Sequence, residues 1–466
     1  MATSRYDVAV IGAGPGGLAG AAAAVRAGAS VALIDSASQP GGQYWRHPSG
    51  DYAAVADLHQ GTAAYRSLVR RAAPAAWFLQ HQVWTIEREK NSFVVRAMAD
   101  GVEVEIAAAA LVLAPGAFDR QVPFPGWDLP GVYTAGGAQA LLKGHQVLAG
   151  RRIAVGGTGP FLLPVAAGLS ARGAEVVGVF EANSPRRWVR QARSVLPVVG
   201  KLAEGAGYAA TLLRHRVPYR VRHAVVAAHG TDSLAAVTVA RLDAHWRVIA
   251  GSERVIDCDA IAVGWGFTPQ LELPLALGCE TRADVDGSLV VCVDDLQQSS
   301  VESVYVAGEA CGVGGAQLAV LEGSIAGRAA AGDAARAISS RQRRRRRALR
   351  AFAAVMHEVH SLRDGWQSWL SDDTVVCRCE EVPAREIRAA VGELGALDAR
   401  SAKRFTRAGM GWCQGRVCGH STGRIAATAA GRSFDPLGLA GPSIASPVPL
   451  GLLARAQAAH HLTTER

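Results

Sequence analysis

The feature that most constrains this chain is the stretch from residue 6 to residue 35, which reads YDVAVIGAGPGGLAGAAAAVRAGASVALID. An apolar run leads into Gly12, Gly14 and Gly17, an Ala-rich segment follows, and a second apolar run ends at Asp35. Strand, tight turn, helix and strand within about 30 residues form the context in which G-x-G-x-x-G indicates dinucleotide binding. A secretory signal or membrane helix is the alternative, and the five glycines, the proline and the single basic flank at Arg5 argue against it.

Each residue of this motif has a separate physical task. Gly12 makes the turn, Gly14 lets the backbone approach a pyrophosphate, and Gly17 lets the helix pack on its strand. The helix N-terminus offers free N–H groups and the positive end of the helix dipole. Asp35 is expected to accept hydrogen bonds from an adenosine ribose.

The composition limits the number of domains and the kinds of partner that this chain can have. A chain of 466 residues with 49% apolar content is expected to fold into about three domains. The net charge of +9 owes most of its excess to one run, Arg341 to Arg350, in which seven of ten residues are arginine. No aromatic-interleaved basic surface accompanies this run, so we expect a solvated helix face or a partner-docking segment and no nucleic acid. No second apolar run is long enough to span a membrane, although peripheral contact with a membrane electron acceptor stays open.

A weaker copy of the opening motif follows. Gly157 and Gly159 repeat the first two glycines with an offset of 145 residues, after a strand expected at 152–155. The third glycine is replaced by Leu162, and the acid, Glu181, falls one residue later than the offset predicts. We expect a second mononucleotide fold that binds NAD(H), another adenine nucleotide or nothing. Glu181 would repel a 2′-phosphate, whereas the arginines at 186 and 187 keep NADP open.

The chain then returns to the first fold. A buried strand is expected at 304–307, followed by Gly308, Glu309 and a Gly-rich entry into a helix from about residue 317 to residue 337. An acid after a buried strand can hold a sugar-like polyol, and the helix N-terminus can face an electron-rich ring. An ordinary strand-to-helix turn is the alternative. Earlier in the same fold, the sequence predicts separate strands at 102–106 and 110–113.

Four of the eight cysteines are bunched. Cys377 and Cys379 are followed, after 33 residues, by Cys413 and Cys418. Four thiolates from two short loops suit an iron–sulfur cluster and also zinc, but structural zinc more often takes ligands two to four residues apart in each loop. The spacing therefore favours [2Fe–2S]. Bunched thiolates also indicate a reducing compartment, and we expect a cytoplasmic protein.

The first motif, the inserted second fold and the return to the strand before Glu309 together resemble the two-dinucleotide-binding-domain flavoproteins. In that family the first fold binds FAD and the second usually binds NAD(P)H. Pro115 departs from the family's Ala-Thr-Gly, and no dithiol pair lies near the predicted flavin, which excludes a dithiol reductase. The FAD-binding residues that the resemblance and the motifs imply are Gly12, Gly14, Gly17, Asp35, Gly42, Gln43, Gly116, Gly308, Glu309 and Gln317. Those of the second nucleotide are Gly157, Gly159 and Glu181.

The C-terminal segments VCRCEEV and GMGWCQGRVCG resemble the [2Fe–2S] domain of the bacterioferritin-associated ferredoxin type. With GGQYWR at 41–46 and YTAGGAQALLKG at 133–144, residues 5–455 resemble the alpha-type flavoprotein subunit of heteromeric amino-acid dehydrogenases, such as opine oxidases, D-hydroxyproline dehydrogenase and hydrogen cyanide synthase. The resemblance implies an amine-oxidising beta-type flavoprotein partner, with a small ferredoxin-like subunit as a further candidate, and an electron-transfer role for this chain. No catalytic acid or base is then needed here.

Two other functions use the same residues. One is a self-contained NAD(P)H-dependent reductase of a ferredoxin-like protein, and the degenerate second motif with Leu162 argues against it. The other is a nucleotide-binding scaffold, which has no need of four thiolates in register. The thirteen histidines form no catalytic pattern; His420 is a candidate for tuning the cluster through a hydrogen bond, or it only leads the chain away from Cys418.

The expected fold class is therefore α/β: two nested Rossmann-like domains of the glutathione-reductase type, then a small helical [2Fe–2S] domain. The expected boundaries are 1–120 plus 285–337 for FAD binding and 121–284 for the second nucleotide. An Arg-rich linker at 338–370, the [2Fe–2S] domain at 371–430 and an extended tail at 431–466 complete the chain.

Overall fold

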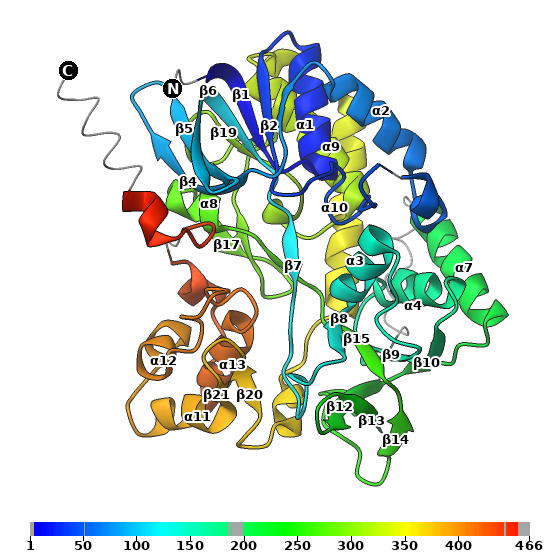
Figure 1. Ribbon diagram of the computed structural model, residues 1–466. Helices are drawn as coiled ribbons and strands as arrows, with labels where there is room; N and C mark the ends of the chain where they lie inside the picture. The colour runs from blue at the N-terminus through cyan, green and yellow to red at the C-terminus, as the bar shows by residue number, and fades with distance from the viewer. Residues whose placement is uncertain (1–3, 51, 185–187, 189–198, 442–443, 455–466) are drawn as a thin grey trace.

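The computed structural model describes residues 4–50, 52–184, 188, 199–441 and 444–454 (Figure 1). Its first domain is built on a seven-stranded sheet with the order β3-β2-β1-β6-β5-β4, in which β19 also pairs with β6. The pairs among β1, β2, β3, β6 and β19 are parallel, and β4, β5 and β6 form an antiparallel meander. The strands are β1 (Ser4–Ile11), β2 (Val31–Ile34), β3 (Ala76–Phe78), β4 (Gln82–Arg88), β5 (Phe93–Ala99), β6 (Val102–Leu113) and β19 (Val304–Val306).

Two helices, α1 (Pro15–Arg26) and α9 (Ala316–Ala330), pack closely on this sheet. A Cβ at Gly323 or Gly327 would overlap the backbone of Gly16 or Gly20, so glycines are what let the two helices approach. The helix expected to reach residue 337 ends at Ala330, because Gly332 adopts a positive φ and a 3₁₀ turn, η4 (Ala334–Arg336), follows. A short 3₁₀ helix, η1 (Ala53–Leu58), and the helix α2 (Thr62–Ala72) lie between β2 and β3.

The strands expected separately at 102–106 and 110–113 are one continuous strand, β6. The run of four alanines at 107–110 lacks the alternation that marks a strand in sequence. It is held as a strand from both sides, because β5 pairs along residues 102–108 and β1 along 106–113. Tertiary pairing therefore overrides weak local propensity here.

The second domain carries a five-stranded parallel sheet with the order β11-β10-β9-β15-β8. Its strands are β8 (Val132–Thr134), β9 (Arg152–Gly157), β10 (Glu175–Glu181), β11 (Tyr219–Val221) and β15 (Ala260–Gly264). The helices beside it are α3 (Ala135–His145), α4 (Leu162–Ala171) and α7 (Val199–Arg214). An antiparallel sheet of β12 (His223–Gly230), β13 (Leu234–Arg241) and β14 (Arg254–Asp257) covers one end.

A bulge in β10 explains why Glu181 comes one residue late. The register of β10 against β9 shifts between Val176 and Gly178, so one extra residue is accommodated. Beyond the bulge, Glu181 lies opposite Gly157. In the first fold β1 pairs with β2 up to Ile11 and Ile34, so the next residue pair is Gly12 and Asp35. The two acids therefore occupy equivalent places.

The two domains are joined by a pair of crossing strands, β7 (Ala117–Asp119) and β16 (Phe267–Pro269), which run antiparallel. Beside them Arg120 forms a buried ion pair with Asp286, at 2.9 Å, and also contacts Ser288. The helix α8 (Glu272–Ala276), the hairpin β17 (Thr281–Ala283) and β18 (Leu289–Val291) then lead back to the first sheet.

The Arg-rich run forms the helix α10 (Ser340–Val359), which begins with a capping box between Ser339 and Gln342. One side of this helix is held by a single buried carboxylate on α9, that of Glu322. Arg350 donates two hydrogen bonds to it, at 2.8 and 2.9 Å, and Arg346 lies 3.6 Å away. Part of the arginine excess is therefore structural, Arg343 lies 3.6 Å from Asp295, and the exposed members are Arg341, Arg344, Arg345 and Arg347.

The C-terminal domain is small and mainly helical. It contains a short pair of strands, β20 (Val375–Cys377) and β21 (Val382–Pro383), and the helices α11 (Ala384–Gly392), α12 (Ala399–Thr406) and α13 (Gly419–Ala429). Two 3₁₀ helices flank it, η5 (Asp364–Trp369) and η6 (Pro436–Leu439). Within the described part of the tail, Ala445 bonds through its N–H to the carbonyl of Trp84 on β4, at 2.9 Å.

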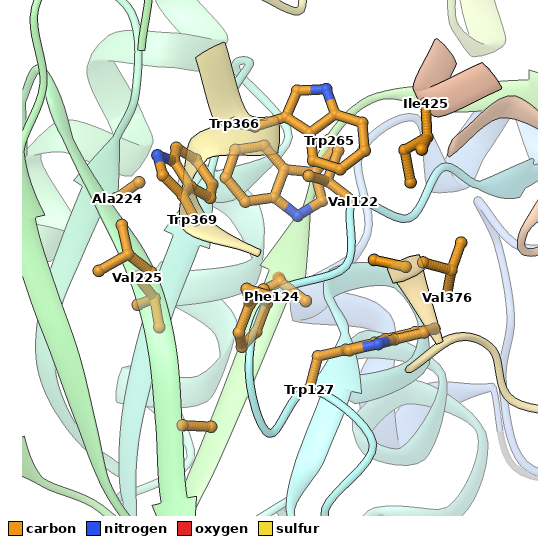
Figure 2. Close-up of a cluster of buried hydrophobic side chains, with 14 of the residues drawn as sticks. Val122, Phe124, Trp127, Ala224, Val225, Trp265, Trp366, Trp369, Val376 and Ile425 are labelled. Carbon is orange, nitrogen blue, oxygen red and sulfur yellow. The ribbon is translucent and has the colours of Figure 1, made fainter. Parts of the chain in front are cut away.

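The core of this domain is continuous with that of the second nucleotide fold. Figure 2 shows Phe124 and Trp127 of the crossover segment beside Trp265, Trp369 and Val376, all of them in one buried cluster. The indole N–H of Trp127 donates to the carbonyl of Val375, at 2.5 Å. The second nucleotide fold and the C-terminal domain therefore share one hydrophobic core.

Among the helices of the described residues, none combines the length and the apolar character that a membrane crossing requires.

Candidate functional site

The first candidate site lies where β1, β6 and β19 end side by side. Ile11 is level with Leu113, and Leu113 with Val306. The segments that follow these strands therefore meet at one edge of the sheet, as expected for a ligand site in an open α/β fold. Each of these exits contains a glycine with positive φ: Gly12, Gly116 and Gly308.

The opening motif has the geometry that its glycines predict. A Cβ on Gly12 would overlap the carbonyl oxygen of Ala114, and one on Gly17 would overlap that of Gly12. Gly14, by contrast, has room, because a Cβ there would meet only the Cα of Gly42, at 3.8 Å. Packing alone does not require glycine at position 14, which leaves approach of a ligand as its reason.

Asp35 lies beside this turn and is partly exposed. Its carboxylate accepts hydrogen bonds from the backbone N–H groups of Ala13, at 2.5 Å, and Ala37, at 2.7 Å. Burial raises the pKa of Asp35, and the two N–H groups together with the charge of Arg46 only partly offset this. The site therefore favours a further donor to this carboxylate, such as a ribose hydroxyl.

The other predicted FAD residues are near the same edge. Gly42 has a positive φ and packs on Gly14, while the side chain of Gln43 is exposed. Glu309 accepts the backbone N–H groups of Gly314, at 2.9 Å, and Gly315, at 3.1 Å, just before α9. Gln317 is exposed in the first turn of α9.

Two basic side chains near Asp35 and Tyr44, Arg46 and Lys143, were not identified from the sequence. Arg46 is close enough to lower the pKa of Asp35, and its side chain packs against Gly144 of α3. Lys143, also on α3, is buried with its Nζ 3.4 Å from the carbonyl of Tyr44, and burial lowers its pKa to about 8. Both belong to the segments 41–46 and 133–144, so those motifs were the available signal.

The second nucleotide fold presents a different surface. Gly157, Thr158, Gly159 and Glu181 are all buried, and Glu181 is only 1% exposed. The helix after the glycines, α4, begins at Leu162, two residues later than the offset of 145 from Pro15 predicts. Leu162 is itself fully buried, where the first motif has the glycine that packs helix on strand.

Protein groups engage both carboxylate oxygens of Glu181. Oε1 accepts from the hydroxyl of Thr158, at 2.6 Å, and from the N–H of Asn183, at 2.8 Å. Oε2 accepts from the N–H of Gly159, at 2.9 Å, and lies 3.5 Å from Nδ1 of His360. Burial acts to raise the pKa of Glu181, but these partners, led by His360, outweigh it and lower that pKa.

His360 comes from the end of α10, 202 positions after Thr158. Its Nε2 accepts the indole N–H of Trp188, at 3.1 Å, so its Nδ1 carries the proton that faces Glu181. The side chain of Asn183 donates to the carbonyl of Ser361, at 3.1 Å. The end of α10 therefore covers the place where a ribose would meet this acid. The arginines at 186 and 187 lie outside the described residues.

The four bunched cysteines come together in the C-terminal domain. Cys418 contacts Cys377 and Cys413, and Cys413 contacts Cys379, so the four sulfurs form a connected row. Cys377 and Cys418 are buried, Cys413 is half-buried and Cys379 is exposed. The described residues contain no group of three or more His, Cys, Asp or Glu side chains arranged to hold a single metal ion. Four thiolates from two loops are the donor set of a cluster in which two thiolates bind each of two irons.

The thiols of this row are unequal. The hydrogen bond from Cys418 is the main cause that lowers the pKa of Cys377 to about 6 and that of Cys413 to about 5. The thiol of Cys418 interacts with both of these sulfurs, and its own pKa is raised. A glycine N–H, that of Gly409, also points at Cys377 Sγ, at 3.4 Å. Thiolates are thus available for metal binding near neutral pH.

His420 does not bond to a cysteine. It is buried, its Nε2 accepts from Arg424 Nε at 3.3 Å, and its ring lies against Phe434. The alternative that it only leads the chain into α13 fits this position.

The cluster loop lies against the strand that leaves the first site. Arg416, between Cys413 and Cys418, forms an ion pair with Glu272 at 2.7 Å, and its guanidinium lies over the ring of Phe118 on β7. Phe118 is two residues beyond Gly116. Ser421 donates to the carbonyl of Gln121, at 2.8 Å, a few residues further along the same segment.

Residues 6–333 match the family model described as pyridine nucleotide-disulphide oxidoreductase, and residues 375–427 match the BFD-like [2Fe-2S] binding domain. The chain is 34% identical over 433 residues to the HcnB subunit of hydrogen cyanide synthase from Pseudomonas aeruginosa, which covers 89% of this chain and 92% of that protein. It is 32% identical over 474 residues to an opine oxidase subunit of Rhizobium meliloti, with 98% and 88% covered.

Among solved structures, L-proline dehydrogenase from P. horikoshii shares this fold. The TM-score is 0.69 at 21% identity, over 97% of this chain and 80% of that one. The first family match implies FAD, and the second implies a [2Fe–2S] cluster. The structure fits both groups, because the first fold leaves Gly14 and Asp35 accessible and the C-terminal domain gathers four sulfurs. The chain therefore belongs to the pyridine nucleotide-disulphide oxidoreductase family, in the group that includes HcnB and the opine oxidase subunit, and it is a flavin-dependent oxidoreductase that ends in a BFD-like [2Fe–2S] domain.

Proposed function

We propose that this chain is the electron-transferring subunit of a heteromeric dehydrogenase, in which a partner flavoprotein of the beta type oxidises an amino acid or an N-substituted amino acid of the opine, hydroxyproline, glycine or sarcosine type. The relatives support a subunit role, because HcnB and its opine oxidase counterpart are both named as subunits. A small ferredoxin-like subunit is a further candidate member of the complex. We place the protein in the cytoplasm, where bunched thiols stay reduced.

The observation that carries this proposal is the contact between the cluster loop and β7. Arg416 stands between two of the cysteines and packs over Phe118, two residues from Gly116 at the flavin edge. The segment from 116 to 121 therefore touches both cofactor sites. FAD carries electrons in pairs or singly and a [2Fe–2S] cluster carries one at a time, so together they supply a change from two-electron to one-electron transfer.

In this proposal the residues of the chain bind and position. Gly12, Gly14 and Asp35 would hold the adenosine diphosphate part of FAD, and Glu309 its ribityl chain. The further contacts assigned to FAD are Gly17, Gly42, Gln43, Gly116, Gly308 and Gln317. Cys377, Cys379, Cys413 and Cys418 would hold the cluster. No side chain of this chain is assigned as an acid or base, because the bond-breaking step belongs to the partner.

The sealed second fold argues against a self-contained NAD(P)H-dependent reductase. Glu181 already has four protein partners, and His360 lies where a ribose would bind. A nucleotide at Gly157 and Gly159 would have to displace the end of α10 first. The scaffold alternative leaves the four sulfurs without a purpose.

The test is an anaerobic reduction of the purified chain. Flavin and iron are first measured, NADH is added, and the flavin absorbance is followed; the chain is then mixed with a co-expressed amine-oxidising flavoprotein and amino-acid substrates. We expect the flavin spectrum to be unchanged by NADH and to bleach with partner and substrate. Rapid bleaching by NADH alone would contradict the proposal and establish the reductase.

A further inference from the structure

The C-terminal domain exposes large apolar side chains where its cysteines reach the surface. Trp412 is 78% exposed, Phe405 52% and Met410 42%. Trp412 immediately precedes Cys413, and its other neighbour, Gly411, lies so close to Cys379 that a Cβ there would overlap that side chain. Clustered exposed apolar residues of this size mark interaction sites on soluble domains.

Met410 and Trp412 flank Gly411 beside the accessible end of the row of sulfurs, and Phe405 lies on the helix α12. Cys379 is exposed and contacts Cys413, whereas Cys377 and Cys418 at the other end are buried. Arg407, at the C-terminal end of α12, forms an ion pair with Glu380 at 2.8 Å and so ties α12 to the loop that holds Cys379. Met410 and Trp412 therefore lie beside the outer cysteines, and α12, which carries Phe405, is held next to the same loop.

The C-terminal part of this domain is rich in basic residues, three of which, Arg407, Arg416 and Arg424, form ion pairs with acids elsewhere. From residue 399 to residue 434 the chain contains no aspartate or glutamate. The basic residues in this stretch are Arg400, Lys403, Arg404, Arg407, Arg416, Arg424 and Arg432. Arg404 is exposed on α12, next to Phe405, and forms no ion pair within the described residues. Glu380 and Glu381 are the nearest acids in sequence to the exposed cysteine, and Glu380 is paired with Arg407.

We propose that Trp412, Met410 and Phe405, with the basic face of α12, form a docking surface for an acidic redox protein that exchanges single electrons with this subunit. The inference rests on the proposed function, since it names the kind of partner that the electron-transferring subunit meets. A redox partner has to approach the exposed edge at Cys379 and Cys413. The exposed arginines of α12, Arg400 and Arg404, would steer an acidic partner toward that edge.

Binding to two probes of opposite charge tests this surface. The flavin- and cluster-loaded chain is titrated calorimetrically at low salt with an acidic plant-type ferredoxin and with basic cytochrome c, and each variant is checked for an unchanged visible spectrum. We expect the ferredoxin to bind, with affinity falling as salt rises, and cytochrome c not to bind. Trp412→Ala and Arg404→Glu should each weaken ferredoxin binding at least about tenfold, and Trp412→Phe should restore most of it.

Matched controls are available elsewhere on the chain. Leu213 on α7 is also 78% exposed, and Arg345 is an exposed arginine of α10. Leu213→Ala and Arg345→Glu should change the affinity less than about twofold. Equal effects of the control and test variants, or no ferredoxin binding at low salt, would overturn the proposal.

Two other occupants give distinct results. If Trp412→Ala converts a dimer to a monomer in sedimentation, the face belongs to a second copy of this chain. If the wild-type chain cosediments with phosphatidylserine vesicles and Trp412→Ala does not, the face binds an anionic membrane. Either result overturns the docking of a redox protein. Failure of the proposed function is seen separately, as bleaching of the flavin by NADH.

Discussion

The two nucleotide folds of this chain place an acid at the same point and use it in opposite ways. Asp35 follows Ile34 beside Gly12, and a bulge in β10 brings Glu181 opposite Gly157. In the first fold the acid stays partly exposed and its pKa is raised, chiefly by burial. In the second fold the acid is buried among protein donors and its pKa is lowered.

The difference shows how a binding site becomes a structural one. In the second fold, the end of α10 takes the place of a nucleotide: His360 faces the carboxylate of Glu181, and the carbonyl of Ser361 accepts a hydrogen bond from the side chain of Asn183. A carboxylate that binds a ligand keeps room to accept further hydrogen bonds. A carboxylate that stabilises the fold already accepts all its hydrogen bonds from the protein. The predictions below separate these two conditions.

The largest expected effect is on FAD. Gly14→Val should reduce the bound flavin to below about a tenth of stoichiometric, because its side chain fills the space through which the pyrophosphate approaches the backbone. Gly159→Ala, at the equivalent point of the second fold, should keep full flavin and lose about 1 kcal/mol of stability from its positive φ. Flavin absorbance per protein after purification measures both, and stoichiometric FAD in Gly14→Val would disprove the assignment of the first site.

Cys413→Ser should abolish the visible absorption of the cluster and leave bound FAD, because no cysteine of this row lies at the ends of β1, β6 or β19. Iron analysis and the visible spectrum report the two cofactors separately. Cys292→Ser, in the first domain, serves as the control and should change neither. Joint loss of flavin and cluster in Cys413→Ser would show that the two sites form one cooperative unit.

Neutral variants of Glu181 and Asp35 should affect different properties, the stability of the chain and the binding of FAD. Glu181→Gln should destabilise the apo chain by about 2–3 kcal/mol at pH 7 and keep FAD, because it leaves buried donors without a full set of acceptors. Asp35→Asn should weaken FAD binding by at least about tenfold and destabilise the apo chain less than Glu181→Gln does, because only two backbone N–H groups at a partly exposed site depend on its carboxylate. Denaturant midpoints and flavin titrations measure these effects, and a large loss of stability in Asp35→Asn would remove the contrast.

The same pKa shifts set opposite pH dependences. Stability from Glu181 is fully present above its unfolded pKa near 4.5 and is lost as the pH falls through its lower folded value. Asp35 has a raised folded pKa, so protonation below that value favours the folded state. Between pH 7 and pH 3 the deficit of Glu181→Gln relative to wild type should therefore shrink, while Asp35→Asn should lose any advantage. Equal curves for the two variants would contradict this assignment.

The smallest effect concerns the contact between the second fold and the C-terminal domain. Trp127→Phe removes one indole donor to the carbonyl of Val375 and keeps most of the apolar surface. We expect a loss of about 1 kcal/mol, measured by the midpoint of cluster loss in denaturant. Trp84→Phe removes an indole on β4, in the first domain, and should not change this midpoint.

The sequence was sufficient for features that depend on local spacing. The turn at Gly12 to Gly17 and the proximity of the four cysteines both follow from motifs that fix backbone geometry or ligand number. The covering of Glu181 by His360 could not be predicted, because the two residues are distant in sequence and meet only through the position of α10. A lone histidine in a polar helix end carries no sequence signal that points to an acid so distant along the chain.

Other misses have the same cause. The continuous strand β6 depends on pairing with β1 and β5, which its alanine run does not reveal. The role of Arg346 and Arg350 depends on Glu322, a single acid hidden in the apolar face of α9. Where partners are distant in sequence, composition indicates an excess of charge but not which charges are used.

The apolar core shared by the second fold and the C-terminal domain limits how this chain can be rearranged. The boundary near residue 371 looks like a place where recombination could exchange one ending for another. Exchange there would leave Trp127 and Trp265 facing water, unless the incoming segment already carried the shapes of Val376 and Ile425. An ending can therefore be exchanged here only if the new segment brings apolar side chains that cover Trp127 and Trp265.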